Sequence, residues 1–171
     1  MITNKNYSYF FPVNSGKSYL RQIPYIQKFV PQKIITGSDL PSKFILLGED
    51  DSDDQEMLKE VFESIDDTFV LFFVNNGSEV LSALEKLKDD QLPCLIVLDY
   101  NMPGLNGADI LQELGTNKRY QGIPKIVWST STSEKFRNLC MELGAVDYVI
   151  KPNSIPDLEK TARYMLSLCL V

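Results

Sequence analysis

The sequence contains an apolar run without polar alternation, residues 94–98, that leads directly into an aspartate, Asp99. This pattern is typical of a strand buried on both faces, and such strands belong to parallel sheets that helices cover on both sides. Pro103, Gly104 and Gly107 then predict a loop. Asp99 would therefore lie at the carboxyl end of a central strand, where open α/β sheets place their chemistry. An aspartate that merely begins a turn is the alternative for this segment alone.

From residue 44 onward, short apolar runs alternate with amphipathic helical patterns. The predicted strands are 44–47, 69–74, 94–98, 125–128 and 147–150. The predicted helices that follow them are 53–64, 78–87, 108–114, 134–143 and 155–168. Five strand–helix units joined by right-handed crossovers predict an α/β fold in three layers. Its core would be a doubly wound, five-stranded parallel sheet of flavodoxin-like strand order 2-1-3-4-5.

The first 42 residues differ from the rest and are predicted to be an extension without its own core, so the main domain would span 43–171. Four prolines and seven aromatic residues interrupt any regular period there. Its Gly16-Lys17-Ser18 is similar to the end of a phosphate-binding loop, but Phe11 stands where that motif needs glycine. We therefore interpret it as part of a loop. Three alternatives stay open for the extension: it docks on the body, it mediates a homodimer, or it has no role.

Charge and composition exclude several kinds of function. Residues 1–43 carry a net charge of +5 and the remainder −11, so the acidic main domain is not expected to bind nucleic acid. No histidine is present, which excludes histidine-based acid–base catalysis and ordinary zinc sites. The chain has no apolar run of membrane-spanning length and no signal-peptide pattern. The three cysteines, Cys94, Cys140 and Cys169, are predicted to be reduced core residues of a cytoplasmic protein.

Polar residues follow four of the predicted strands. Glu49-Asp50 follow the first strand, Asp99 the third, Ser129 the fourth and Lys151 the fifth. In strand order 2-1-3-4-5 the first and third strands are neighbours, so their carboxylates would share one crevice. Carboxylates in such a crevice suit Mg²⁺, while a lysine and a hydroxyl suit the oxygens of a phosphoryl group. This combination is suited to the formation of an aspartyl phosphate.

Four segments resemble the receiver domain of two-component response regulators over about residues 43–171: Glu49-Asp50, Leu98–Gly107, Trp128-Ser129-Thr130 and Gly144–Pro152. The resemblance implies that Asp99 is the phosphoacceptor. It implies that Mg²⁺ is bound by Asp50 and Asp99, by the backbone carbonyl of Asn101, and by Glu49 through water.

The resemblance also assigns the remaining site residues. Lys151 would bind the phosphoryl group, and the bond between Lys151 and Pro152 would be cis. Ser129 would be the hydroxyl that moves toward the phosphoryl group, and Tyr148 would turn inward in response. Asp51, Asp53 and Asp54 are interpreted as helix-start and solvent-facing acids rather than ligands.

These assignments predict a bacterial, cytoplasmic single-domain response regulator that is a phosphoprotein rather than an enzyme in the usual sense. A sensor histidine kinase or a phosphotransfer protein would donate the phosphoryl group. The output would pass to an unknown protein through the surface of the fourth helix, fifth strand and fifth helix. A receiver-like scaffold that is not phosphorylated is the main alternative. A flavodoxin-like electron carrier is disfavoured, because its phosphate loop would have to follow the first strand. An aspartyl-phosphate phosphatase is disfavoured, because it would need Asp in place of Asn101.

Overall fold

The computed structural model describes residues 43–169, so the predicted extension with its Gly16-Lys17-Ser18 lies outside the described residues. Five parallel strands form one sheet in the order β2-β1-β3-β4-β5, which confirms the predicted fold class. The strands are β1 (Phe44–Gly48), β2 (Val70–Val74), β3 (Leu95–Asp99), β4 (Lys125–Ser129) and β5 (Asp147–Ile150). The helices are α1 (Ser52–Ile65), α2 (Gly77–Lys86), α3 (Gly107–Thr116), α4 (Glu134–Glu142) and α5 (Ile155–Leu168), with short 3₁₀ turns at Asp89–Gln91 and Lys118–Tyr120.

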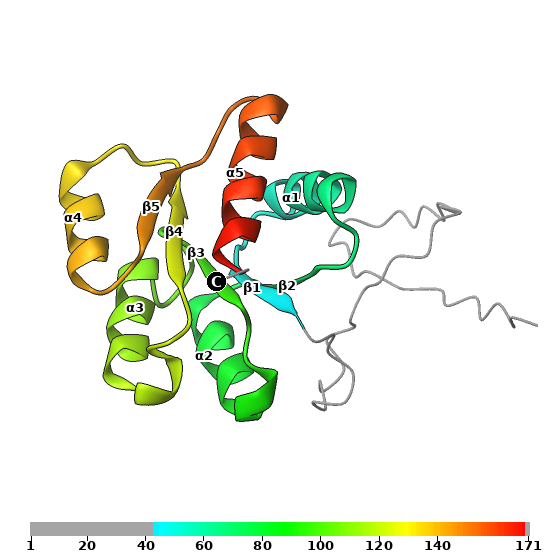
Figure 1. Ribbon diagram of the computed structural model, residues 1–171. Coiled ribbons are helices and arrows are strands. Elements are labelled where there is room, and N and C mark those ends of the chain that lie inside the picture. Colours follow the sequence, from blue (N-terminus) through cyan, green and yellow to red (C-terminus); the bar gives the residue numbers. More distant parts are fainter. Residues whose placement is uncertain (1–42, 170–171) are drawn as a thin grey trace, which may run out of the picture.

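The helices cover the sheet in two layers. Helices α1 and α5 lie together on one face, and α2, α3 and α4 lie on the other (Figure 1). Every residue of β1, β3 and β4 is buried, which explains why these strands lack polar alternation. The sheet therefore holds its central strands rigidly and leaves their carboxyl ends free to form a site.

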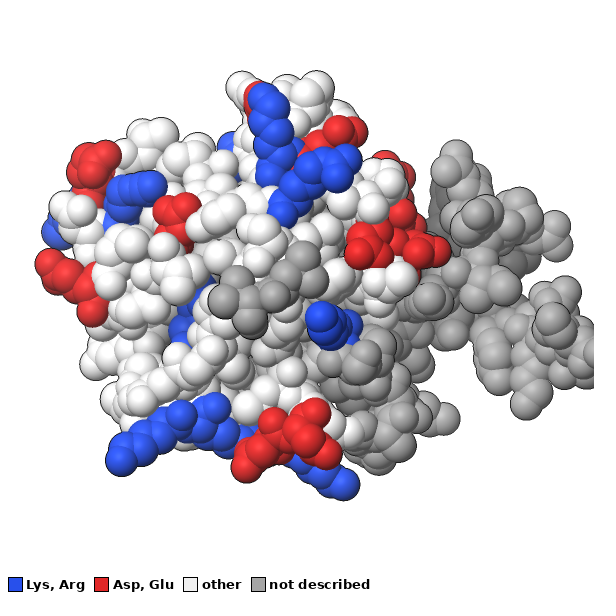
Figure 2. Space-filling model, in the orientation of Figure 1, with Lys and Arg blue, Asp and Glu red and all other residues white. Residues whose placement is uncertain are grey.

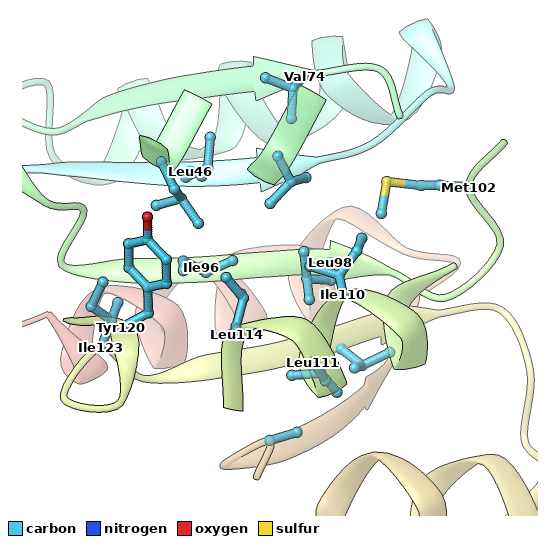
Figure 3. Close-up of a cluster of buried hydrophobic side chains, with 14 of the residues drawn as sticks. Leu46, Val74, Ile96, Leu98, Met102, Ile110, Leu111, Leu114, Tyr120 and Ile123 are labelled. Carbon is cyan, nitrogen blue, oxygen red and sulfur yellow. The ribbon is translucent and has the colours of Figure 1, made fainter. Parts of the chain in front are cut away.

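The larger of two hydrophobic clusters lies between the sheet and α2, α3 and α4. Leu46, Ile96 and Leu98 contribute from β1 and β3, and Ile110 and Leu114 contribute from α3 (Figure 3). All five are at most 1% exposed. Burying one such side chain stabilises a fold by about 1.5–3 kcal/mol, so this cluster is a main source of stability for the strands that carry the site.

A disulfide joins Cys94, just before β3, to Cys169, at the end of α5. The two residues are 75 positions apart in sequence and their Cα atoms are 4.9 Å apart, within the usual range for a disulfide. The prediction of reduced thiols is therefore wrong for this pair. The spacing along the chain could not reveal the contact, because the fold brings α5 back across the start of β3. Cys140 is a free, buried thiol.

Within the described residues, no helix is both long and apolar enough to cross a membrane.

Candidate functional site

Four polar side chains meet at the carboxyl edge of the sheet. Glu49 directly follows β1, Asp99 ends β3, Ser129 ends β4 and Lys151 directly follows β5. Glu49 is 1% exposed, Asp99 7% and Ser129 0%, so these are buried polar groups among apolar strands. Burying such groups costs free energy unless they are paired, and that makes a cluster of them a candidate for function.

The loop after β3 fixes the position of Asp99. The backbone N–H of Asn101 donates to Asp99 Oδ1 at 3.0 Å, and the N–H of Gly107 donates to the carbonyl of Tyr100 at 3.1 Å. A Cβ atom at residue 107 would lie only 2.9 Å from the backbone carbonyl oxygen of Asp99, so the loop can return this closely only with glycine. Asn106 then caps α3 in a reciprocal arrangement with Asp109.

Lys151 joins the acidic side chains to one another. Its Nζ lies 2.8 Å from Glu49 Oε2, 2.7 Å from Asp54 Oδ2 and 3.0 Å from Asp99 Oδ2. The same atom lies 4.8 Å from the centre of the Trp128 ring, close enough for a cation–π contact. An ammonium group has three N–H donors, so three carboxylates occupy all of them.

Burial and pairing shift the protonation of these groups in opposite ways. Burial raises the pKa of Glu49 from 4.5 to about 7, although the hydrogen bond and charge of Lys151 oppose this rise. Burial acts to lower the pKa of Lys151, but its hydrogen bonds to Asp54 and Glu49 outweigh burial and hold that pKa above the ordinary value. Lys151 therefore stays charged at neutral pH, while Glu49 titrates near neutrality.

The raised pKa of Glu49 predicts a loss of stability with rising pH in metal-free protein. Between about pH 4.5 and 7 the folded state holds a proton that the unfolded state lacks, so the free energy of unfolding falls as the pH rises. For this single group the decrease is about 3 kcal/mol. Urea unfolding in EDTA at several pH values measures it. In Glu49→Gln this contribution should vanish, and equal slopes for both proteins would contradict the assignment.

Three carboxylates are placed to hold a metal ion. Oxygen atoms of Glu49, Asp50 and Asp99 all lie within 4.8 Å of one another. This donor set contains oxygen only, which suits Mg²⁺ or Mn²⁺ and not a metal that prefers thiolate or imidazole. Asp50 is exposed, so the group is open to solvent on one side. The residues present therefore fit the predicted metal.

The side chains of Ser129 and Tyr148 are both hydrogen-bonded to the backbone of Ser131. The Ser129 hydroxyl oxygen accepts a hydrogen bond from the N–H of Ser131 at 3.1 Å, and the Tyr148 hydroxyl donates to the Ser131 carbonyl at 3.0 Å. Tyr148 is 2% exposed and so occupies the inward position. Tyr100, which directly follows Asp99, stacks on Phe136 of α4 at 4.5 Å between ring centres and contacts Tyr148 edge to face.

Two expectations need correction. No peptide bond among the described residues is cis, so the predicted cis bond between Lys151 and Pro152 is wrong. The trans form is favoured by about 0.5–1 kcal/mol for such a bond, and Lys151 reaches its partners with a trans bond. The interpretation of Asp54 as a solvent-facing acid is also wrong, because its carboxylate pairs with Lys151. Its place in the first turn of α1, near the acidic pair, was the only signal for this role.

Asp51, in contrast, is a helix-start residue as predicted. Its side chain caps α1 by accepting hydrogen bonds from the backbone N–H groups of Asp53 and Asp54. The structure therefore brings together Glu49, Asp50 and Asp99 as acids, and places Lys151, Ser129 and Asn101 at the same edge. Whether the carbonyl of Asn101 binds a metal stays a prediction.

Comparison with known proteins identifies relatives of this chain. The response regulator receiver domain family matches residues 45–163. The response regulator Rcp1 of Synechocystis is 29% identical over 133 residues, which cover 76% of this chain and 90% of Rcp1. The two-component response regulator ARR8 of Arabidopsis thaliana is 28% identical over 141 residues, which cover 73% of this chain and 62% of ARR8. The chain thus spans less than two thirds of ARR8.

Solved structures of similar proteins agree with the fold. The phosphorylated cyanobacterial phytochrome response regulator RcpA has a TM-score of 0.68 and 25% identity, covering 75% of this chain and 94% of RcpA. The Mn²⁺-bound form of Rcp1 has a TM-score of 0.63 and 30% identity, covering 73% of this chain and 92% of Rcp1. With its parallel sheet, its acidic cluster and the family match over most of its length, the chain belongs to the response regulator receiver domain family.

Proposed function

We propose that this chain is a phosphoacceptor of two-component signalling, in which Asp99 receives a phosphoryl group from a sensor histidine kinase or a phosphotransfer protein. The observation that carries the proposal is the site itself, where Asp99 lies 3.0 Å from Lys151 and within the acidic group of Glu49 and Asp50. A scaffold that only binds partners would gain nothing from burying these charges together.

The roles of the residues follow from their positions. A carboxylate oxygen of Asp99 attacks the phosphorus of a phosphohistidine, and the phosphorus–nitrogen bond breaks, with its electron pair leaving on the histidine of the donor. Lys151, already beside Asp99, balances the negative charge of the phosphoryl oxygens. The Ser129 hydroxyl then donates a hydrogen bond to one of these oxygens, while the Tyr148 ring occupies the space beside Ser129.

The proposed metal is Mg²⁺. Asp50 and Asp99 would hold it directly with the backbone carbonyl of Asn101, and Glu49 would do so through water. When bound, the ion supplies positive charge that favours transfer of a phosphoryl group. The Mn²⁺ in the crystal structure of Rcp1 supports a divalent cation in a related protein.

The proposed output surface consists of α4, β5 and α5. Among the described residues, all large exposed hydrophobic side chains except Met57 lie on these elements or in the loops that connect them. They are Leu139, Met141, Val146, Ile150, Ile155 and Tyr164. Exposed apolar side chains concentrated on these elements favour binding of another protein. A downstream partner or a second copy of the chain, as in a homodimer, is proposed to bind here.

Receiver domains are generally signalling domains rather than enzymes. We propose an extension at 1–42 and a receiver domain at 43–171 that undergoes slow autodephosphorylation. The acidic charge of residues 44–171 supports a protein that does not bind nucleic acid. In Figure 2, acidic and basic side chains are interspersed over the described part of the visible face.

The proposed location is the cytoplasm, where a kinase draws on ATP.

Fluorescence of Trp128 tests the proposed function. Trp128 is the only tryptophan, is 2% exposed and lies against Lys151, so a movement of Lys151 changes the charge over its ring. We expect Mg²⁺ to change the emission, and beryllofluoride, a mimic of the phosphoryl group, to cause a second, saturable change. Asp99→Asn should lose the second change. A native protein that responds to neither addition would contradict the proposal.

A further inference from the structure

The carboxylate of Asp54, from the first turn of α1, is a third partner of Lys151. Its Oδ2 atom lies 2.7 Å from Lys151 Nζ, slightly closer than the oxygens of Glu49 at 2.8 Å and Asp99 at 3.0 Å. The Asp54 side chain is 24% exposed, against 1% for Glu49 and 10% for Asp99, so Asp54 is the most exposed of the three partners of Lys151. The cap made by Asp51, which accepts from the Asp54 N–H at 3.3 Å, fixes the start of α1.

Asp54 differs from the other two partners in its relation to the metal group. Glu49 and Asp99 belong, with Asp50, to the carboxylates that could hold a cation, and Asp54 is not a member of that group within the described residues. A cation would neutralise Glu49 and Asp99 and weaken their hold on Lys151. The pair between Asp54 and Lys151 would persist, because the cation would not neutralise Asp54.

A phosphoryl group on Asp99 needs the same ammonium group. In the structure all three N–H donors of Lys151 are hydrogen-bonded to carboxylates. A phosphoryl oxygen can therefore accept a hydrogen bond from Lys151 only when one of these carboxylates loses its own. Asp54 keeps one N–H donor of Lys151 occupied, and its negative charge also repels the negatively charged phosphoryl group. Both effects weaken binding of the phosphoryl group.

We propose that Asp54 is a positioning residue that restrains Lys151 and competes with the phosphoryl group for it, and so sets how readily Asp99 is phosphorylated. The inference rests on the proposed function of Asp99. Because the pair is partly exposed, we expect the competition to weaken binding about threefold to tenfold.

Beryllofluoride binding at saturating Mg²⁺ tests this role. Asp54→Asn keeps the shape of the side chain and removes its charge, so its half-saturating concentration should be about threefold to tenfold lower than in the native protein. Asp53→Asn is the matched control, since Asp53 is exposed, belongs to the same helical turn and carries the same charge. It should stay within twofold of the native value. Asp54→Glu keeps the charge and should also stay near the native value.

The outcomes separate this inference from the proposed function. A merely structural role would make Asp54→Asn bind more weakly, and would lower its melting temperature relative to Asp53→Asn. Equal half-saturating beryllofluoride concentrations for Asp53→Asn and Asp54→Asn would overturn the inference and leave the phosphoacceptor role intact. Weaker beryllofluoride binding by Asp54→Asn would have the same meaning. No binding to the native protein would overturn both.

Discussion

Replacing Lys151 with methionine is expected to slow phosphorylation of Asp99 by about 100-fold or more, because the variant loses a positive charge aimed at the transferred group. The ammonium group lies 3.0 Å from Asp99, and its side chain is only 9% exposed, so water cannot take over its role. Intact mass spectrometry during incubation with acetyl phosphate and Mg²⁺ measures the rate. Lys160→Met is the control, since Lys160 is 76% exposed and pairs only with Asp157 among the described residues.

The same substitution is expected to destabilise the metal-free protein by about 3 kcal/mol, since removing one partner leaves buried carboxylates without compensation. Glu49 can take up a proton, which keeps the cost at the low end of the range for a broken buried ion pair. Mg²⁺ should restore part of this stability. Urea unfolding with EDTA and with Mg²⁺ provides the measurement. Equal stability of Lys151→Met and Lys160→Met in EDTA would show that the cluster does not depend on Lys151.

Opening the disulfide between Cys94 and Cys169 is expected to lower the free energy of unfolding by about 3–4 kcal/mol. The bond closes a long loop of 75 positions, and such a closure removes conformational entropy from the unfolded chain. For a domain of this size the change corresponds to a melting temperature roughly 10–15 °C lower. Helix α5 should stay in place in reduced protein, because Leu158, Ala162 and Met165 pack in the core.

Thermal unfolding with and without a reductant measures this effect. Cys94→Ser should melt at the same temperature under both conditions and near the reduced native protein. Cys140 is a free thiol in the structure, so Cys140→Ser should keep the full difference between oxidised and reduced samples. A native protein with the same melting temperature in both conditions would contradict a stabilising bond.

The elements of the fold could be predicted because their signals are local. The apolar run before Asp99 became β3, and α1 begins one residue before its predicted start because Asp51 caps it. The alternation of strands and helices predicts a parallel sheet, so Glu49, Asp99, Ser129 and Lys151 were expected at the carboxyl ends of their strands. The strand order β2-β1-β3-β4-β5 places those ends side by side at one sheet edge.

Features that depend on contacts between distant residues could not be predicted in this way. Cys94 and Cys169 form a disulfide only because α5 crosses the start of β3. Asp54 and Lys151 are 97 positions apart, and in sequence Asp54 has the same pattern as its exposed neighbour Asp53. Only the fold shows that one of these two acids reaches the lysine.

The central claim is that Asp99 accepts a phosphoryl group with the help of a divalent cation. Incubation of the purified protein with acetyl phosphate, followed by intact mass measurement, tests it most directly. We predict a gain of one phosphoryl group in the native protein with Mg²⁺, and no gain in EDTA or in Asp99→Asn. A native protein that stays unmodified with Mg²⁺, or a gain that persists in Asp99→Asn, would contradict the account.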